Sequence, residues 1–284
     1  SSSHTHVLLM DAAWDGLLSN EDAVAPEVVA RRVELLAVAS VPAHQSSWDV
    51  VVAGSGFMAL YYLGVQSIFD AAGIQVKRFA GASSGAMLPM ELCVLGLDRV
   101  VDLYLEYGRL QEAHPAGFFA SAWRADRHWK RFSEALFADE TAAQAVDDRV
   151  YASVTRLTWR GATNVVYSRY ASAAFAKSVY YATGTALTTC DGYYCTDGGV
   201  TDAAPLFTDG QRPQLVVRPT RCGLSKDKVA KFDATNDVPA FIAKGQADAR
   251  ALLDALRADP TLDRWENEAT SLSFSTTTSA PTTQ

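Results

Sequence analysis

The chain has 284 residues, of which 49% are hydrophobic and 20% charged, and its formal net charge is −7. This composition is that of a globular protein with one large or two small domains, and it excludes a disordered or fibrous chain. The acidic balance argues against a nucleic-acid partner, because such proteins carry a basic surface. Four cysteines are too few for a disulfide scaffold. We expect Cys190 and Cys195 to be free thiols, although a small disulfide loop between them stays open.

The first half of the chain predicts a strand–helix–strand unit. Residues 1–47 are expected to form an N-terminal helical extension. Trp48–Ala53 then predicts a buried strand, Phe57–Ala72 a helix that ends at Gly73, and Gln75–Ala80 a second strand. A strand, a crossover helix and another strand place two strands side by side in parallel, so the fold is predicted to be α/β.

Val50–Phe69 is a run of twenty residues without a charge, long enough as a helix to cross a bilayer. The run contains Gly54-Ser55-Gly56 directly after a β-branched segment. A buried strand, a glycine turn and a buried helix therefore explain it better than a membrane span. No charged segment followed by an apolar run opens the chain, and no signal peptide is predicted.

The remaining elements follow the same periodicity rules. Further helices are predicted at Met87–Leu97, Arg99–Glu112, Asp126–Phe137, Ala171–Thr183 and Pro239–Arg257. Further strands are predicted at Val150–Trp159, Asn164–Tyr170 and Leu215–Arg218. With no internal repeat or linker, we expect one catalytic domain over residues 48–265 and a disordered Ser/Thr-rich tail over 266–284.

Two glycine-containing turns follow the first two predicted strands. Gly54-Ser55-Gly56 lies between a strand and a helix, where backbone N–H groups and the helix dipole favour a phosphate or a developing oxyanion. Close packing of strand and helix is the alternative reading of this turn. Gly81-Ala82-Ser83-Ser84-Gly85 matches G-x-S-x-G, with Ser83 in the position of the nucleophile between a strand and a helix. Gly81 and Gly85 supply the small residues that so sharp a turn requires, and Ser84 is interpreted as a small flanking residue.

A third motif, Asp197-Gly198-Gly199, is followed by Asp202 and Pro205. Ser83 needs a base, and only His114 and His128 of the five histidines follow it in the chain. Because no histidine follows Asp197, the Ser–acid–His order of the α/β-hydrolases is impossible with this acid. An aspartate that acts directly on the serine is the economical interpretation.

In order and spacing, these three motifs resemble the patatin-like phospholipases over about Asp49–Pro205. The segment Ala53–Val65 (AGSGFMALYYLGV) is especially similar to the adiponutrin-type branch. The resemblance implies a patatin-like three-layer α/β/α sandwich with a mostly parallel central sheet. It also implies a Ser–Asp dyad, with Ser83 as nucleophile and Asp197 as base, and an oxyanion hole at Gly54, Ser55 and Gly56, without a cofactor or metal.

The function implied by the resemblance is that of a serine lipid acyl hydrolase, of the phospholipase A or triacylglycerol lipase type. Its substrate would be a glycerolipid or phospholipid, and hydrolysis and acyl transfer both stay open. An intracellular protein associated peripherally with a membrane or lipid-droplet surface is expected, with no nucleic-acid partner and an open oligomeric state. Gly117–Trp123 is the candidate lipid contact, with burial of its aromatic side chains as the alternative.

Two positions depart from the family pattern. Ala59 stands where the family usually has glycine, and Asp202-Ala203-Ala204 stands where D-N usually precedes the proline. A non-catalytic lipid-binding protein is therefore one alternative function. The other is an NADP-binding oxidoreductase, because Gly54-x-Gly56-x-x-Ala59 fits the dinucleotide fingerprint. In that case Arg78, on the second predicted strand, would have to hold the extra phosphate.

Overall fold

The computed structural model describes residues 46–113, 129–223, 225, 234–259, 261–262 and 264–267. Most of the predicted N-terminal extension, the candidate lipid contact at Gly117–Trp123 and residues 268–284 of the predicted tail lie outside these ranges. The same holds for all five histidines.

The described residues form an α/β fold around one mixed, mostly parallel sheet. Its strands are β1 (Ser47–Val52), β2 (Gln75–Ala82), β3 (Val150–Thr158), β4 (Gly161–Tyr167), β5 (Thr188–Cys190), β6 (Tyr193–Asp197), β7 (Gln214–Val217) and β8 (Arg264–Glu266). They are ordered β5-β6-β3-β2-β1-β7-β8, and β4 pairs with β3. The pairings among β2, β1, β7 and β8, and that of β2 with β3, are parallel, whereas β4, β5 and β6 pair antiparallel. The predicted fold class is confirmed at this level.

The helices are η3 (Gly56–Leu60), α2 (Tyr61–Ala72), α3 (Ser84–Leu95), α4 (Leu97–Ala113), α6 (Glu140–Val146), α7 (Ala173–Gly184), η4 (Gly198–Val200), η5 (Pro219–Arg221) and α8 (Ala234–Ala258). Residues 129–136 are also helical. The predicted strand–helix–strand unit is confirmed, and Gly73 ends α2 in the left-handed conformation with φ 72°. The uncharged run at Val50–Phe69 is divided among β1, a loop, η3 and α2. None of the described helices is long and apolar enough to cross a membrane.

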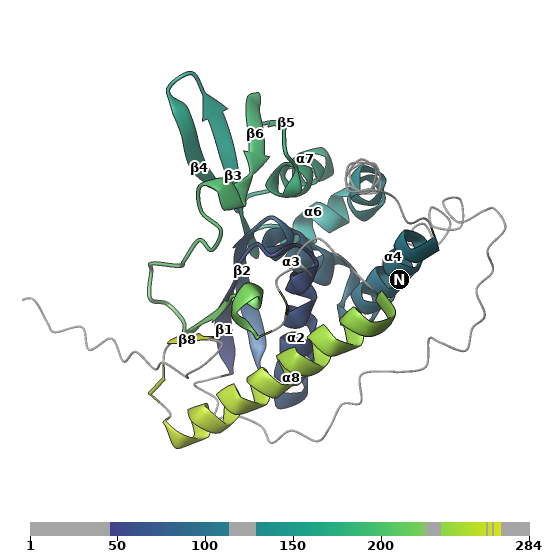
Figure 1. The fold of residues 1–284 in the computed structure, drawn as a ribbon. Coiled ribbons are helices and arrows are strands. Elements are labelled where there is room, and N and C mark those ends of the chain that lie inside the picture. Colours follow the sequence, from purple (N-terminus) through teal and green to yellow (C-terminus); the bar gives the residue numbers. More distant parts are fainter. Residues whose placement is uncertain are drawn as a thin grey trace, which may run out of the picture.

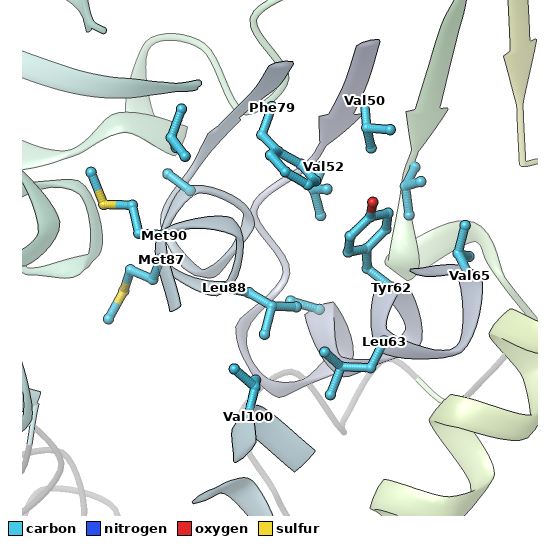
Figure 2. Packing of buried hydrophobic residues seen from close by; sticks show 14 of the residues in the cluster. Val50, Val52, Tyr62, Leu63, Val65, Phe79, Met87, Leu88, Met90 and Val100 are labelled. Carbon is cyan, nitrogen blue, oxygen red and sulfur yellow. The ribbon is translucent and has the colours of Figure 1, made fainter. Parts of the chain in front are cut away.

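Side chains alternate along β1 and so divide between two clusters. Val50 and Val52 pack in the large core with the helices, whereas Val51 packs in a smaller cluster that includes Ala204 and Phe207. In the large core, the ring of Tyr62 on α2 meets the ring of Phe79 on β2 edge-on, with centroids 5.9 Å apart (Figure 2). The large core thus packs α2 against the face of β1 and β2 that carries Val50, Val52 and Phe79.

Helices α2 and α8 pack at very short range because glycines line their crossing. A Cβ atom at Gly64 would lie 2.0 Å from the carbonyl oxygen of Ile242, and one at Gly245 would lie 2.0 Å from that of Tyr61. Only glycine fits such backbone contacts. The crossing joins α8, far along the chain, to the strand–helix–strand unit at its start.

Six described elements have no counterpart among the predicted ones: α6, η4, η5, β5, β6 and β8. With β8, the sheet reaches Glu266, one residue beyond the predicted end of the domain. Cys190 and Cys195 lie in β5 and β6 and are free and buried, as predicted. No disulfide loop joins them.

The antiparallel part of the sheet extends beyond its parallel part. We call β4, β5, β6, Val154–Thr158 of β3 and the Trp159-Arg160 turn the arm, and the remaining described elements the body. Figure 1 shows the arm, labelled β3 to β6, standing at the top of the view, away from α2 and α8. The arm and the body meet where β2 and β6 end.

Candidate active site

Ser83 and Asp197 are brought together because two strands end against the same edge of β3. Ala82, the last residue of β2, pairs with Ser153, and Asp197, the last residue of β6, pairs with Val154. The other edge of β3 is occupied by β4. Since β2 and β6 run toward each other along one edge, their carboxyl ends meet at adjacent positions of β3 (Figure 1).

Ser83 lies on a sharp turn between β2 and α3, at φ 54° and ψ −137°. A non-glycine residue at positive φ is held there by its surroundings, and such strain is concentrated at functional sites. A Cβ atom at Gly81 would lie 2.2 Å from the carbonyl oxygen of Gly85, and one at Gly85 would lie 2.1 Å from that of Val52. The requirement for small residues two positions before and after Ser83 is therefore confirmed.

Hydrogen bonds from a distant helix fix this turn. The Ser83 N–H donates to Thr183 of α7, at 3.1 Å from its carbonyl oxygen and 3.0 Å from its hydroxyl oxygen. The Thr183 hydroxyl in turn donates to the Ser153 carbonyl oxygen at 2.7 Å. The Ser83 carbonyl accepts the N–H groups of Ala86 and Met87, which begins α3. The turn is thus tied to α7, β3 and α3 at once.

Asp197 faces Ser83 from the end of the arm, and both residues are half-buried. The Asp197 N–H donates to the carbonyl oxygen of Thr185 at 2.8 Å. Its carboxylate accepts the N–H of Gly199 at 2.7 Å, and the Ser83 hydroxyl lies close enough to lower the pKa of this carboxylate as a hydrogen-bond donor. A Cβ atom at Gly198 would lie 2.0 Å from the Ser153 carbonyl oxygen, so the turn after Asp197 packs directly on β3.

Burial raises the pKa of Asp197 above its ordinary value of 3.8, while the hydrogen bonds from Ser83 and Gly199 oppose that rise. Removing solvent from a carboxylate makes it a stronger proton acceptor. A hydroxyl and a desolvated carboxylate in hydrogen-bond contact form the arrangement that activates a serine for nucleophilic attack.

The Gly54-Ser55-Gly56 loop lies directly beside Ser83, since a Cβ atom at Gly54 would lie 3.1 Å from the Ser83 Cβ. Two of its three N–H groups have internal acceptors. The Gly54 N–H donates to the Ala203 carbonyl oxygen at 3.1 Å, and the Ser55 N–H donates to the Ser84 hydroxyl oxygen at 3.2 Å. Of this loop, Gly56 alone keeps an N–H without an acceptor in the described part of the chain.

Two further polar groups beside the loop lack partners within the described ranges. The Ser84 N–H begins α3 and has no acceptor there, as the first N–H groups of a helix generally do not. The Ser55 hydroxyl oxygen is buried and also without a partner. The backbone donors left for a developing negative charge are therefore the N–H groups of Gly56 and Ser84.

Three residues of this site were not predicted as functional. Ser84 holds the glycine loop through its hydroxyl, whereas it was interpreted as a flanking residue. Thr183 and Ser153 anchor the Ser83 turn from α7 and β3. Ser84 stands in the motif itself, but nothing in the sequence links Thr183 to a serine one hundred positions away.

Arg78, which the dinucleotide alternative would assign to a phosphate, is engaged in ion pairs. Its guanidinium contacts the carboxylates of Asp49, which is fully buried, and of Asp209. It also lies over the ring of Phe207 at 4.3 Å from the centroid. These contacts hold the guanidinium against the sheet.

Comparisons with known proteins do not add to this geometry. No family model matches the chain, and no curated protein matches it.

Proposed function

We propose that this chain is a patatin-like serine acyl hydrolase that cleaves fatty-acyl esters of glycerolipids or phospholipids. The observation that carries the proposal is the strained turn at Ser83, whose hydroxyl lies close enough to the Asp197 carboxylate to lower its pKa as a hydrogen-bond donor. The order of the three motifs and the α/β fold with a mostly parallel sheet also support it. The finer assignment, a patatin-like three-layer sandwich, is part of the same proposal.

In the first step, the Ser83 Oγ attacks the ester carbonyl carbon while its proton moves to the Asp197 carboxylate. The C=O π electrons move onto the carbonyl oxygen, which becomes an oxyanion. The N–H groups of Gly56 and Ser84 donate to this oxygen. Gly54 and Ser55, with their N–H groups engaged, act in this proposal as positioning residues for Gly56.

The tetrahedral intermediate then collapses to an acyl-enzyme. The bond to the leaving alcohol breaks, and Asp197 returns its proton to that alcohol oxygen. In the second half, Asp197 takes a proton from water as the water oxygen attacks the ester carbonyl of acylated Ser83. Collapse of this intermediate releases the fatty acid and restores the Ser83 hydroxyl with the proton from Asp197.

The departures from the family pattern leave these groups in place. Ala203 supplies the carbonyl oxygen that accepts the Gly54 N–H, a role that does not depend on its side chain. The Asp202 carboxylate accepts the Ala204 N–H at 3.1 Å, which closes this turn without an asparagine. Ala59 is buried in η3. We therefore favour a catalytic protein over one whose site has decayed.

A non-catalytic lipid-binding protein is the second candidate. The observation in its favour is that two of the three loop N–H groups expected in the oxyanion hole are already bonded. The NADP-binding alternative is not favoured, because Arg78 is held by Asp49 and Asp209.

The test is hydrolysis of p-nitrophenyl butyrate and of a phospholipid panel by the wild-type chain, Ser83→Ala and Ser84→Ala. Ser83→Ala is expected to lose turnover by many orders of magnitude, about 10⁶-fold where the background rate allows it to be measured. Ser84→Ala, the matched control one residue away, keeps the nucleophile and loses only the acceptor of the Ser55 N–H, so about a tenfold loss is expected. Activity that survives Ser83→Ala but not Ser84→Ala would reassign the nucleophile. A folded wild-type chain without activity on any ester would favour the lipid-binding candidate.

A further inference from the structure

Large apolar side chains are exposed in only one part of the described molecule. Seven are exposed in the described ranges: Trp159, Val166, Leu187, Tyr193, Tyr194, Val200 and Leu206. All seven lie in the segment 159–206, which contains most of the arm and the turn after Asp197. Scattered exposed apolar residues are ordinary in proteins, but their gathering in one segment marks an interaction surface.

The tip of the arm combines aromatic and cationic groups. Trp159 and Arg160 form the two-residue turn between β3 and β4, and Trp159 is 87% exposed. The Arg160 guanidinium lies 4.6 Å from the Trp159 ring centroid. Tyr194, 66% exposed, stands opposite Leu157 on the neighbouring strand. Indole and phenol rings suit the boundary between acyl chains and headgroups, and a guanidinium suits the phosphate beside them.

The exposed residues continue to the candidate active site. Val200, 66% exposed, stands three positions after Asp197. Leu187, 61% exposed, stands two positions after Thr185, whose carbonyl oxygen accepts the Asp197 N–H. Two exposed apolar side chains thus stand close to the base, one after Asp197 itself and one after the residue that accepts its N–H.

Charge also distinguishes this segment from the rest of the chain. Residues 159–206 carry three basic side chains, Arg160, Arg169 and Lys177, against three acidic ones, Asp191, Asp197 and Asp202. The whole chain has a net charge of −7, so its excess of acid lies outside the segment. The segment that contains most of the arm therefore carries none of the chain's net negative charge and adds no net repulsion toward an anionic surface.

We propose that the arm, with Trp159, Arg160 and Tyr194 at its outer end and Leu187 and Val200 beside Asp197, is the surface by which the protein docks on a phospholipid bilayer. The choice of a lipid as the occupant rests in part on the proposed function, because that function places the substrate in a lipid aggregate. Because the exposed residues extend from the outer end of the arm to the turn after Asp197, docking along the arm would bring the meeting point of β2 and β6 toward the lipid surface.

The test measures binding without turnover. The 284-residue chain with Ser83→Ala is sedimented with phosphatidylcholine vesicles, with and without phosphatidylserine, and compared with the same protein carrying Trp159→Ser and Tyr194→Ser. Loss of vesicle affinity by about tenfold or more is expected for the double serine variant. The matched control, Trp159→Phe with Tyr194→Phe, keeps apolar rings at both positions and is expected to retain most of the affinity.

The same pairs of substitutions are made with Ser83 intact and assayed on soluble p-nitrophenyl butyrate, with the melting temperature as a check on folding. Equal vesicle binding by the serine and phenylalanine variants would overturn the proposal, as would wild-type protein that does not bind vesicles. Self-association that the serine variants abolish, without vesicle binding, would instead assign the arm to contacts between copies of the chain. Arm-dependent vesicle binding by a protein that hydrolyses no ester would support the docking surface and refute the hydrolase.

Discussion

The body and the arm each supply one half of the candidate dyad, and they do so by different means. In the body, Ser83 is held by close backbone packing around Gly81 and Gly85 and by hydrogen bonds to Thr183. In the arm, Asp197 stands at the end of a five-residue antiparallel strand whose neighbours expose large apolar side chains. The nucleophile is therefore fixed by close packing in the body, whereas the base is carried at the end of a strand whose neighbouring residues are exposed to solvent. Variants in each region separate these two contributions.

The largest effect expected from the arm is that of Asp197→Asn. The amide keeps the shape of the side chain but does not accept the Ser83 proton, so kcat/KM should fall by about 10⁴-fold. The melting temperature should change little. In the wild type, activity should fall as the pH drops through the pKa of Asp197, which burial raises above 3.8. Steady-state kinetics across pH measure the loss in kcat/KM and the pH dependence of the wild type. If Asp202→Asn lost activity to this extent while Asp197→Asn stayed active, the base would be reassigned to Asp202.

In the body, Gly85→Ala tests whether packing holds the Ser83 turn. The new methyl group would lie 2.1 Å from the Val52 carbonyl oxygen, so β1 or α3 must shift. The free energy of unfolding is expected to fall by about 3 kcal/mol or more, and activity with it. Gly73→Ala is the control, because it meets no atom within 4 Å and carries only the strain of φ 72°, about 1–2 kcal/mol. Urea denaturation that ranks the two variants in the reverse order would refute the packing account.

The sequence predicts the closely packed body better than the exposed arm. The strand–helix–strand unit of the body is predicted because its apolar runs are long and Gly73 marks the helix end. β5 and β6 are missed because they have only three and five residues, and β6 also exposes Tyr193 and Tyr194, so no apolar alternation distinguishes these strands from a loop. Helix α6 is also missed, although Asp139 caps it by accepting the N–H groups of Thr141 and Ala142.

In the candidate site, motifs indicate which residues to consider but not how their N–H groups are used. Ser83 and Asp197 stand out by their glycine neighbours alone. That the Gly54 and Ser55 N–H groups are engaged depends on Ala203 and Ser84, whose positions follow only from the tertiary fold. Propensity and spacing carry no information on such pairings.

Glu91 on α3 is a buried carboxyl of the body that the proposed reaction does not use, and it predicts a pH-dependent stability. It is 0% exposed, its Oε1 accepts the Tyr180 hydroxyl at 2.6 Å, and burial raises its pKa from 4.5 to about 7. The folded state binds the proton of the Glu91 carboxyl more tightly than the unfolded state does. The stabilisation that this protonated carboxyl gives to the fold is therefore fully present below pH 4.5 and is lost as pH rises to about 7. The loss amounts to about 3 kcal/mol.

Glu91→Gln removes this titration. The difference in unfolding free energy between variant and wild type, measured by urea denaturation at pH 5 and pH 8, should therefore shift in favour of the variant at the higher pH. A difference that is the same at both values would show that Glu91 does not titrate in this range.

Ala59→Gly is expected to have the smallest effect. Glycine within η3 should lower the free energy of unfolding by about 0.5–1 kcal/mol, because the unfolded chain gains backbone freedom. If the buried methyl group constrains the loop that carries Gly56, turnover should be preserved or raised. Kinetics and urea denaturation on the same preparation test this. A large loss of activity would show that the loop is adapted to alanine.

The central claim is that Ser83 is a nucleophile activated by Asp197, and covalent labelling tests it most directly. Wild-type protein, Ser83→Ala and Asp197→Asn are treated with a fluorophosphonate, and the modified residue is located by peptide mass spectrometry. The account predicts one adduct on Ser83 in the wild type, none in Ser83→Ala and much slower labelling in Asp197→Asn. An adduct on Ser84, equal labelling of all three proteins, or a folded wild-type protein that takes no label would contradict it.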